Sequence, residues 1–250
     1  MLHQLLLGGG AIEQNGGRTR LTIPKTSARA YADSQLDDYR GLRRSRFPDA
    51  PPARVVLRAR ASHPAPAGTL GFGFWNDPFS LNGGGLAAPN TVWFFYASRP
   101  SDMALADDVP GFGWKAATLN AGRPPTILLA PAALAALALT HIPGLGQPVM
   151  TAARQAVKAH EALLNDIALT DWHTYEIEWQ KDCALFRVDG VERLRSPAPP
   201  GGPLGLVLWI DNQYALASRA GKFGFGLCEV KEGQWLEVEG VRLEKSEEAR

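Results

Sequence analysis

The segment Asp171-Trp-His-Thr-Tyr-Glu-Ile-Glu-Trp-Gln-Lys-Asp-Cys-Ala-Leu-Phe-Arg-Val-Asp-Gly190 decides the fold class of this chain. Its residues alternate between apolar and polar types, which is the two-residue period of a β-strand. We predict strands at 172–179, 184–188 and 191–194. The dipeptide Asp189-Gly190 supplies the positive φ angles that a two-residue hairpin turn needs. This segment therefore predicts consecutive antiparallel strands.

The same alternation continues in both directions along the chain. It predicts strands at 54–62, 68–75, 91–98, 112–119, 203–210, 222–228 and 235–243. Gly71 and Gly73 share one face of their strand and leave room for a group to approach the backbone closely. Residues 91–98 are apolar on both faces, as expected of a central strand that is covered on both sides. Many short strands joined by Gly- and Pro-containing turns predict an all-β fold.

One region departs from this pattern. Residues 131–140 are rich in Ala and Leu, which are good helix formers, and Pro148 begins a stretch with apolar residues at helical spacing. We predict a short helical insertion at about 131–169 that packs on the sheet, with a lid over a cleft as the alternative. There is no internal repeat or low-complexity linker, so we expect residues 1–250 to form a single domain.

The composition argues against several function classes. With 26 basic and 25 acidic residues, the chain has no electrostatic case for binding nucleic acid or an anionic membrane. No Cys/His spacing matches a zinc site, so we predict no metal and no cofactor. The apolar run at Leu5–Leu7 is short and no Lys or Arg precedes it, so we predict no secretory signal and a cytoplasmic protein.

Several motifs in the C-terminal half resemble glycoside hydrolase family 16, part of the concanavalin A-like lectin and glucanase superfamily. That family often has a His-x-Tyr-x-x-Glu-Trp strand followed by a hairpin strand that ends in Val-Asp-Gly. The matching residues are His173, Tyr175, Glu178, Trp179, Val188, Asp189 and Gly190. Residues 203–209 and 236–243 resemble the family's later strands. The resemblance implies a two-sheet antiparallel jelly-roll sandwich whose concave sheet forms a cleft.

The family's catalytic carboxylates are missing from the corresponding strand. Family members carry Glu-x-Asp-x-Glu on one strand, because one carboxylate attacks the anomeric carbon while another protonates the leaving oxygen. The strand in that place here, Asn90–Ser98, contains no acidic residue. We therefore predict a family 16-like protein that does not hydrolyse glycosides by that family's mechanism, and we assign no catalytic residue.

The resemblance places a ligand site in the concave cleft, where aromatic faces stack on sugar rings and polar groups bind the hydroxyls between them. The residues predicted to contact the ligand are Trp75, Asn76, Asp77, Trp93, Phe95, Trp209, Asp211 and Gln213. Each of the aromatic residues could equally belong to the core, because a sandwich of this length needs a large one. We expect the partner to be a carbohydrate or another small molecule.

Two alternative functions stay open at this point. The aromatic strand at residues 91–96 would also suit an enzyme of different chemistry that acts on an apolar small molecule. A glycoside hydrolase with relocated carboxylates, drawn from Asp77, Asp211 and Glu176, requires two of these carboxyl groups to lie close together.

Other polar residues receive structural interpretations. His173 matches a position that is structural in the family, and Cys183 and Cys228 are expected to be buried thiols. Asp37 and Asp38 are adjacent in the chain, so on a strand they would point to opposite faces and would not act together. Glu239 lies where the family often has an acidic residue near a structural calcium, but it is Glu in place of Asp and the other ligands are missing, so we assign no metal ligand and calcium binding stays open.

Overall fold

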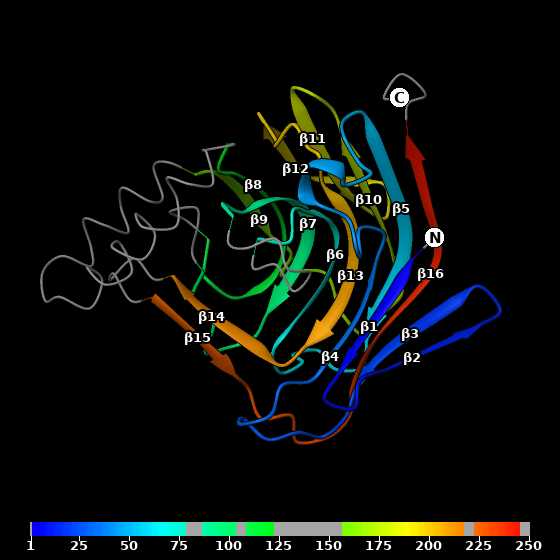
Figure 1. Ribbon diagram of the computed structural model, residues 1–250, viewed down its shortest axis with the longest axis vertical. Coiled ribbons are helices and arrows are strands. Elements are labelled where there is room, and N and C mark those ends of the chain that lie inside the picture. Colours follow the sequence, from blue (N-terminus) through cyan, green and yellow to red (C-terminus); the bar gives the residue numbers. More distant parts are fainter. Residues whose placement is uncertain (1, 79–86, 104–108, 123–156, 218–222, 246–250) are drawn as a thin grey trace, which may run out of the picture.

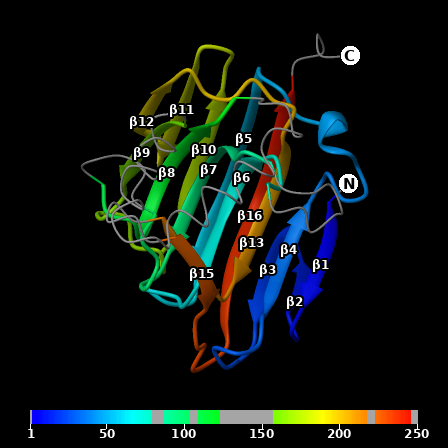
Figure 2. The same cartoon turned by 60° about the vertical axis from the view of Figure 1, so that its left-hand side comes forward.

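The computed structural model describes residues 2–78, 87–103, 109–122, 157–217 and 223–245. Their strands form two antiparallel seven-stranded sheets and a separate two-stranded hairpin (Figure 1). The strands of the two sheets run in similar directions, as in an aligned sandwich (Figure 2). The predicted all-β jelly-roll sandwich is confirmed, and each strand predicted from alternation is present with its ends shifted by a few residues. No helix among these described residues is long and apolar enough to cross a membrane.

Sheet A carries the face on which the candidate site lies. Its strands, in order across the sheet, are β1 (His3–Leu7), β4 (Asp33–Asp37), β13 (Gly205–Asp211), β6 (Thr69–Trp75), β7 (Asn90–Ala97), β8 (Gly113–Asn120) and β9 (Lys158–Leu163). The hairpin of β14 (Gln213–Ala217) and β15 (Phe223–Leu227) continues from the end of β13. In Figure 1 this hairpin extends away from sheet B.

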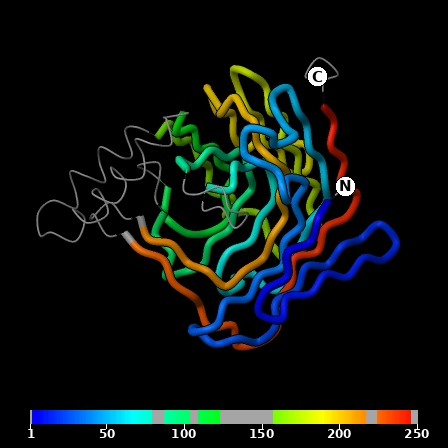
Figure 3. The backbone as a smooth tube through the Cα atoms, in the orientation of Figure 1, coloured from blue at the N-terminus to red at the C-terminus, as the bar shows by residue number. Residues whose placement is uncertain are grey.

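Sheet B forms the opposite layer. Its strands, in order, are β12 (Val191–Pro197), β11 (Cys183–Val188), β10 (His173–Trp179), β5 (Ala53–Ala61), β16 (Gln234–Lys245), β3 (Arg18–Ile23) and β2 (Ala11–Asn15). The backbone trace in Figure 3 shows the first strands of the chain running beside its last strand. A single 3-10 turn, η1 (Arg44–Arg46), follows β4 within the described part of the chain.

One apolar cluster fills the space between the sheets, because alternate residues of each strand point inward. Aromatic rings meet across this space. Phe72 of sheet A packs on Tyr175 of sheet B with ring centroids 5.1 Å apart, and Phe74 packs on Trp179 at 5.1 Å. All four side chains are almost completely buried. The core therefore uses one face of sheet A and leaves the other face available for other roles.

The hairpin predicted at Asp189-Gly190 is confirmed. Val188 and Val191 are direct partners across β11 and β12, and the two turn residues have φ angles of 51° and 79°. Nδ1 of His173 lies 2.6 Å from a carboxylate oxygen of Asp189, which ties β10 to this turn. The structural interpretation of His173 is consistent with this contact.

The predicted helical insertion is wrong in its last part. Residues 123–156 lie outside the described residues, but residues 158–163 form the edge strand β9 and pair with β8. The side chains explain this choice. Glu161 lies opposite Ala117 and diagonally across from Lys115 of β8, and the charged groups of Glu161 and Lys115 form a buried ion pair with Nζ and Oε2 2.9 Å apart. This tertiary contact outweighs the weak helical preference of an Ala-containing segment.

The two thiols differ from each other. Cys228 is buried as predicted, whereas Cys183, at the start of β11, is only partly buried. Both cysteines are free.

The outer face of sheet B carries a network of Arg and Glu side chains. Glu237 of β16 is nearly buried and accepts hydrogen bonds from Arg20 at 2.7 and 2.9 Å and from Arg60 at 2.8 Å. Both guanidinium groups also lie over the ring of Trp235, at 4.8 and 5.3 Å. Burial alone would raise the pKa of Glu237, but these hydrogen bonds and charges lower it.

Replacing Glu237 by Gln is expected to lower the free energy of unfolding by about 2 kcal/mol at pH 7, because charge-assisted hydrogen bonds from two arginines are lost. The matched variant Glu239→Gln removes a more exposed carboxylate that pairs with Arg18 and Arg58, and it should cost less than about 1 kcal/mol. Because the folded-state pKa of Glu237 is lowered, its contribution is lost as pH falls below about 4. Urea melts at pH 7 and pH 3 measure both effects, and equal losses for the two variants would contradict the prediction.

Candidate functional site

We call the side of sheet A that faces away from sheet B the outer face. The strand register places its side chains in rows that cross the sheet. Successive rows are Asp33, Asp211, Thr69 and Ala97; then Gln35, Trp209, Gly71, Phe95 and Lys115; then Asp37, Val207, Gly73, Trp93 and Ala117; then Gly205, Trp75, Thr91 and Leu119. Acidic and amide groups therefore occupy β4 and the end of β13, aromatic rings occupy the middle, and Lys115 lies beyond them.

Four aromatic side chains form what we call the aromatic floor: Trp75, Trp93, Phe95 and Trp209. The ring of Trp93 lies 5.1 Å from that of Phe95 and 5.3 Å from that of Trp209, measured between centroids. The planes of Trp75 and Trp209 are within 6° of parallel. Trp209 and Phe95 are buried, whereas Trp75 and Trp93 are only partly buried. The structure thus brings together the four aromatic residues named from the sequence.

The glycines of this face accommodate rings from the chain itself. A Cβ atom on Gly71 would lie 2.7 Å from Cη2 of Trp209, and one on Gly205 would lie 2.3 Å from Cδ1 of Tyr39. The room predicted beside the glycine-rich strand β6 therefore exists at Gly71, where the ring of Trp209 occupies it, while the ring of Tyr39 lies against Gly205 of β13. Glycine is needed at both positions because these rings lie close against the backbone.

A polar network borders the aromatic floor on the β4 side. The Tyr39 hydroxyl accepts hydrogen bonds from Nε1 of Trp75 and from Nε2 of Gln35. Gln35 also donates to Asp37 at 2.9 Å, and the guanidinium of Arg40 donates to the same carboxylate oxygen at 2.6 Å. Burial raises the pKa of Tyr39, and the Asp37 carboxylate adds to this. The network holds Trp75 in place.

Asp33 and Asp211 form a second acidic group, at the end of the floor nearest to Trp209. They are direct partners on the adjacent antiparallel strands β4 and β13, and both point to the outer face. Oδ1 of Asp211 accepts hydrogen bonds from the Thr69 hydroxyl at 2.7 Å and from the Gln213 backbone N–H at 3.0 Å. The Tyr31 side chain also hydrogen-bonds to Asp211. In contrast, Oδ2 of Asp33 is buried without a hydrogen-bond partner among the described residues.

The two carboxyl groups have different proton affinities. Burial raises the pKa of Asp33 to about 8, and the charges of Asp211 and Asp37 add to this more than Arg40 offsets it. Burial also raises the pKa of Asp211, but hydrogen bonds from Thr69, Gln213 and Tyr31 hold it at about 6. A carboxylate with hydrogen-bond donors ionises more readily than one without them. At neutral pH the pair therefore holds one proton, on Asp33.

The remaining predicted residues do not join this group. Asn76 and Asp77 follow the end of β6 opposite to Thr69, the partner of Asp211, and six residues of strand separate the two ends by roughly 20 Å. Glu176 lies on sheet B, where it binds Arg54 at 2.9 Å and Arg187 at 3.0 Å. No two of Asp77, Asp211 and Glu176 lie close together, so the alternative hypothesis gains no carboxylate pair from these three residues.

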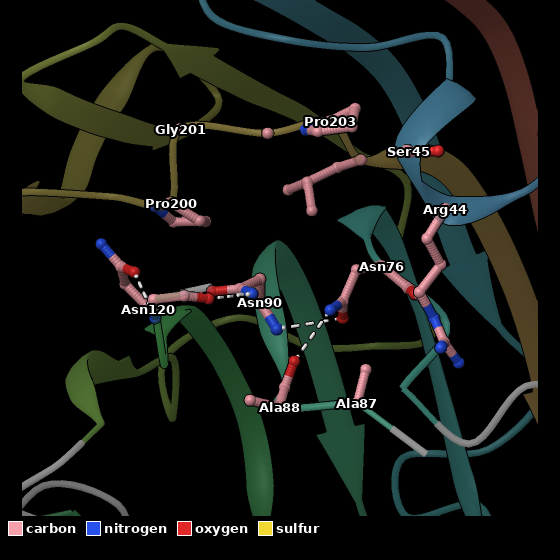
Figure 4. Close-up of a pocket in the computed structure, with 13 residues that line it drawn as sticks. Arg44, Ser45, Asn76, Ala87, Ala88, Asn90, Asn120, Pro200, Gly201 and Pro203 are labelled. Carbon is pink, nitrogen blue, oxygen red and sulfur yellow. Dashed lines mark hydrogen bonds between the residues drawn. The ribbon is translucent and has the colours of Figure 1, made fainter. Parts of the chain in front are cut away.

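A cavity of about 340 Å³, lined by both polar and apolar groups, lies beyond the Trp75 end of the floor (Figure 4). Asn76, Asn90 and Asn120 line it, but each amide already binds the backbone. Asn76 donates to the Ala88 carbonyl at 2.8 Å and accepts from the Asn90 N–H, while Asn120 donates to the Ala198 carbonyl at 3.1 Å. These amides hold loops at the strand ends, and neither Asp33 nor Asp211 lines this cavity.

The described part of the chain contains no group of three His, Cys, Asp or Glu side chains arranged to hold a metal ion. Glu239, the residue considered for calcium, instead pairs with Arg18 and Arg58 on the outer face of sheet B.

Sequence reasoning missed Asp33, Gln35 and Tyr39 as members of the site. Asp33, Gln35 and Asp37 alternate with Ser34 and Leu36, which is the pattern of a strand with one polar face. The core-facing residues of this strand are Ser34 and Leu36, so only one apolar side chain marks its inner face and no apolar alternation is visible in the sequence. Asp37 and Asp38 do point apart as expected, since Asp38 accepts the backbone N–H of Leu206 at 2.8 Å.

The fold is a two-sheet antiparallel jelly roll, and solved structures of the same fold class are similar to it. Within that class, a legume lectin-like domain from Entamoeba histolytica has a TM-score of 0.51 at 9% identity, covering 98% of this chain and 90% of that one. A laminarinase from Flavobacterium sp. UMI-01 has a TM-score of 0.49 at 12% identity, over 94% and 81% of the two chains. An immunostimulatory antigen and pseudo β-1,3-glucanase of Mycobacterium tuberculosis has a TM-score of 0.49 at 11% identity, over 92% and 75%.

At such low identity these likenesses concern the fold alone. No protein-family profile matches the sequence, and no curated protein is similar to it.

Proposed function

We propose that the outer face of sheet A binds a carbohydrate chain, with its sugar rings stacked on the aromatic floor. The observation that carries this proposal is the cluster of Trp75, Trp93, Phe95 and Trp209 on one face of a jelly-roll sheet. The apolar C–H faces of a sugar ring match the surface of an indole. Trp75 and Trp93 are only partly buried, so they are the rings available for stacking.

The groups beside the floor suit the hydroxyls of the same ligand. Small-molecule sites typically combine an apolar lining with a few well-placed polar groups. The Asp37–Arg40 pair and Gln35 lie on one side of the rings, and the Lys115–Glu161 pair lies on the other. These are donors and acceptors fixed by mutual hydrogen bonds, so they change conformation little when a ligand arrives.

The proposal is tested by calorimetry with β-1,3-, β-1,4- and mixed-linked gluco-oligosaccharides. Trp93→Ala is expected to weaken binding at least tenfold, because the loss of one stacked ring removes about 1.4 kcal/mol or more of contact energy. The matched control is Trp235→Ala, which removes a partly buried tryptophan from the outer face of sheet B. This control should bind as the wild type does.

Two results would count against a carbohydrate ligand. One is the absence of binding to the whole panel by a protein whose near-ultraviolet circular dichroism shows native packing. The other is a thermal shift caused by apolar aromatic compounds and by none of the sugars, which would favour an apolar small molecule on the same face.

A further inference from the structure

The cavity of Figure 4 begins where the aromatic floor ends. Asn76, which lines it, follows Trp75 in the chain. Asn90, which also lines it, precedes Thr91, and Thr91 is the direct partner of Trp75 across β6 and β7. The cavity volume of about 340 Å³ is within the range of about 300–1,000 Å³ that small-molecule sites occupy. A sugar chain that stacks on Trp75 therefore has room to continue into this cavity.

Arg44 gives the cavity a positive lining. Among the described residues it is the one charged residue that lines the cavity, and it lies on the 3-10 turn η1. Its guanidinium donates to the backbone carbonyls of Asn76 at 2.9 Å and of Asp77 at 3.0 Å, so its position is fixed (Figure 4). The charge of Asp77 acts on Arg44, but the Asp77 side chain is 2% exposed and does not line the cavity.

Two further arginines lie on the same turn. Arg43 is the residue before η1 and Arg46 is its last residue, and both side chains are exposed. Neither side chain forms an ion pair or a hydrogen bond with another described residue. By contrast, the arginines on the outer face of sheet B pair with glutamates. The turn therefore presents positive charge to solvent beside the cavity.

The acidic residues that flank this turn in the chain do not neutralise it. The Asp37 carboxylate pairs with Arg40 at 2.6 Å, and Asp49 pairs with Lys245. Asp38 lies beside Asp49, and burial raises its pKa to about 7. The whole chain has a net charge of only +1, so the excess at this turn comes from the arrangement of the charges. Exposed guanidinium groups at the rim of a cavity attract an anionic ligand.

We propose that this cavity binds an acidic group, a carboxylate or a sulfate, on the carbohydrate held by the aromatic floor. This inference rests on the proposed function and names the class of its ligand, an acidic glycan. A guanidinium presents two parallel N–H groups, a geometry suited to the paired oxygens of such anions. The aromatic floor contacts the apolar faces of the sugars, and the arginine turn selects chains with a negative charge next to the stacked unit.

The first test compares oligosaccharides that differ only at C6. Calorimetry is done with the neutral gluco-oligosaccharides, with the same chains oxidised to the carboxylate at C6, and with the same chains sulfated at C6. The wild type should bind at least one acidic form about tenfold or more tightly than the neutral form, because charge-assisted hydrogen bonds are the stronger ones. This preference should shrink as the ionic strength rises from about 0.05 M to about 0.5 M. The carboxylated and sulfated forms together identify the anion.

The second test asks whether the arginine turn causes the preference. The readout is the ratio of the affinities for the acidic and the neutral chain, which a general loss of binding leaves unchanged. Arg44→Gln should bring this ratio close to one. Because Arg44 also holds the backbone at Asn76, a second variant combines Arg43→Gln with Arg46→Gln and changes only exposed side chains. The double variant should lower the ratio at least about threefold, and lysine at both positions should retain most of it, because the charge is kept.

Arg29→Gln is the matched control. It removes an exposed arginine that precedes the start of β4, whereas η1 follows the end of that strand. This variant should keep the wild-type ratio.

The outcomes separate this inference from the proposed function. Neutral chains that bind as tightly as both acidic forms overturn the acidic ligand and leave carbohydrate binding intact. A preference that survives in Arg44→Gln and in the double variant overturns the assignment to this cavity. Polyglutamate that competes as strongly as the acidic oligosaccharide also overturns it, because the attraction would then be unspecific. Failure of every neutral and acidic chain to bind removes the proposed function and this inference with it.

Discussion

Replacing Asp33 by Asn is expected to stabilise this protein at pH 8 by about 3 kcal/mol, which corresponds to an increase in Tm of roughly 10 °C. An amide cannot ionise, so it escapes the cost of placing a negative charge in a buried site beside Asp211 and Asp37. Most substitutions of buried residues destabilise a protein, which makes this direction a sharp test of the acidic pair.

The pH dependence follows from the raised pKa. Folded Asp33 holds its proton up to about pH 8, whereas an unfolded aspartate releases it near pH 4. The contribution of this group to stability is therefore fully present below pH 4 and is lost as pH rises toward 8. Asp211, with a pKa of about 6, adds the same trend over a narrower range. The advantage of Asp33→Asn should accordingly be small at pH 4 and largest at pH 8.

Thermal melts from pH 4 to pH 9 measure this prediction. Asp37→Asn is the matched control, because Asp37 lies on the same strand and face but binds the Arg40 guanidinium and backbone N–H. This control should lose stability at pH 8. A lower Tm of Asp33→Asn at every pH would contradict this prediction. It would show that native contacts of the Asp33 carboxyl group stabilise the folded protein by more than its burial costs.

Gly71→Ala is expected to lower the free energy of unfolding by about 3 kcal/mol and to abolish binding on the aromatic floor. An added Cβ would lie 2.4 Å from the backbone oxygen of Phe94 and 2.7 Å from the ring of Trp209. The backbone oxygen belongs to the central strand β7 and cannot move without disturbing the sheet. The ring can move only by leaving its place among Trp75, Trp93 and Phe95.

Urea denaturation, tryptophan fluorescence and calorimetry with the oligosaccharide panel report the stability, the ring displacement and the binding. Gly201→Ala is the control, since a Cβ there meets nothing within 4 Å and its backbone needs no positive φ. Wild-type binding by Gly71→Ala would show that the position of Trp209 is irrelevant to the ligand.

The strands of this fold were largely predictable from local pattern. Alternation with a period of two located β5 to β8, β10 to β13, β15 and β16, because one face of each strand meets the apolar core. The Asp189-Gly190 turn was predictable because its φ angles are a property of the two residues themselves. Strand β4 was not predicted because only one of its core-facing residues, Leu36, is apolar.

Where the local sequence pattern was not decisive, the secondary structure of a segment depended on the strands with which it pairs. Residues 158–163 contain Ala and Leu that suit a helix equally well, and pairing with β8 decides for a strand. The N-terminal strands β1 to β3 are short, and they are secured by partners that include the C-terminal strand β16. Long-range pairing of this kind is settled by packing and not by the propensity of the segment.

The amino-acid sequence alone determined the all-β class, the hairpin turn and the four aromatic residues of the floor. The period of the apolar pattern, the residues of a turn and the type of a side chain are all local properties of the chain. Only the tertiary structure decided that Asp33 opposes Asp211 and that Asp77 and Glu176 lie elsewhere. Residues distant in the chain become neighbours through strand order and register, and a shift of one residue in the pairing of β4 would turn Asp33 to the opposite face.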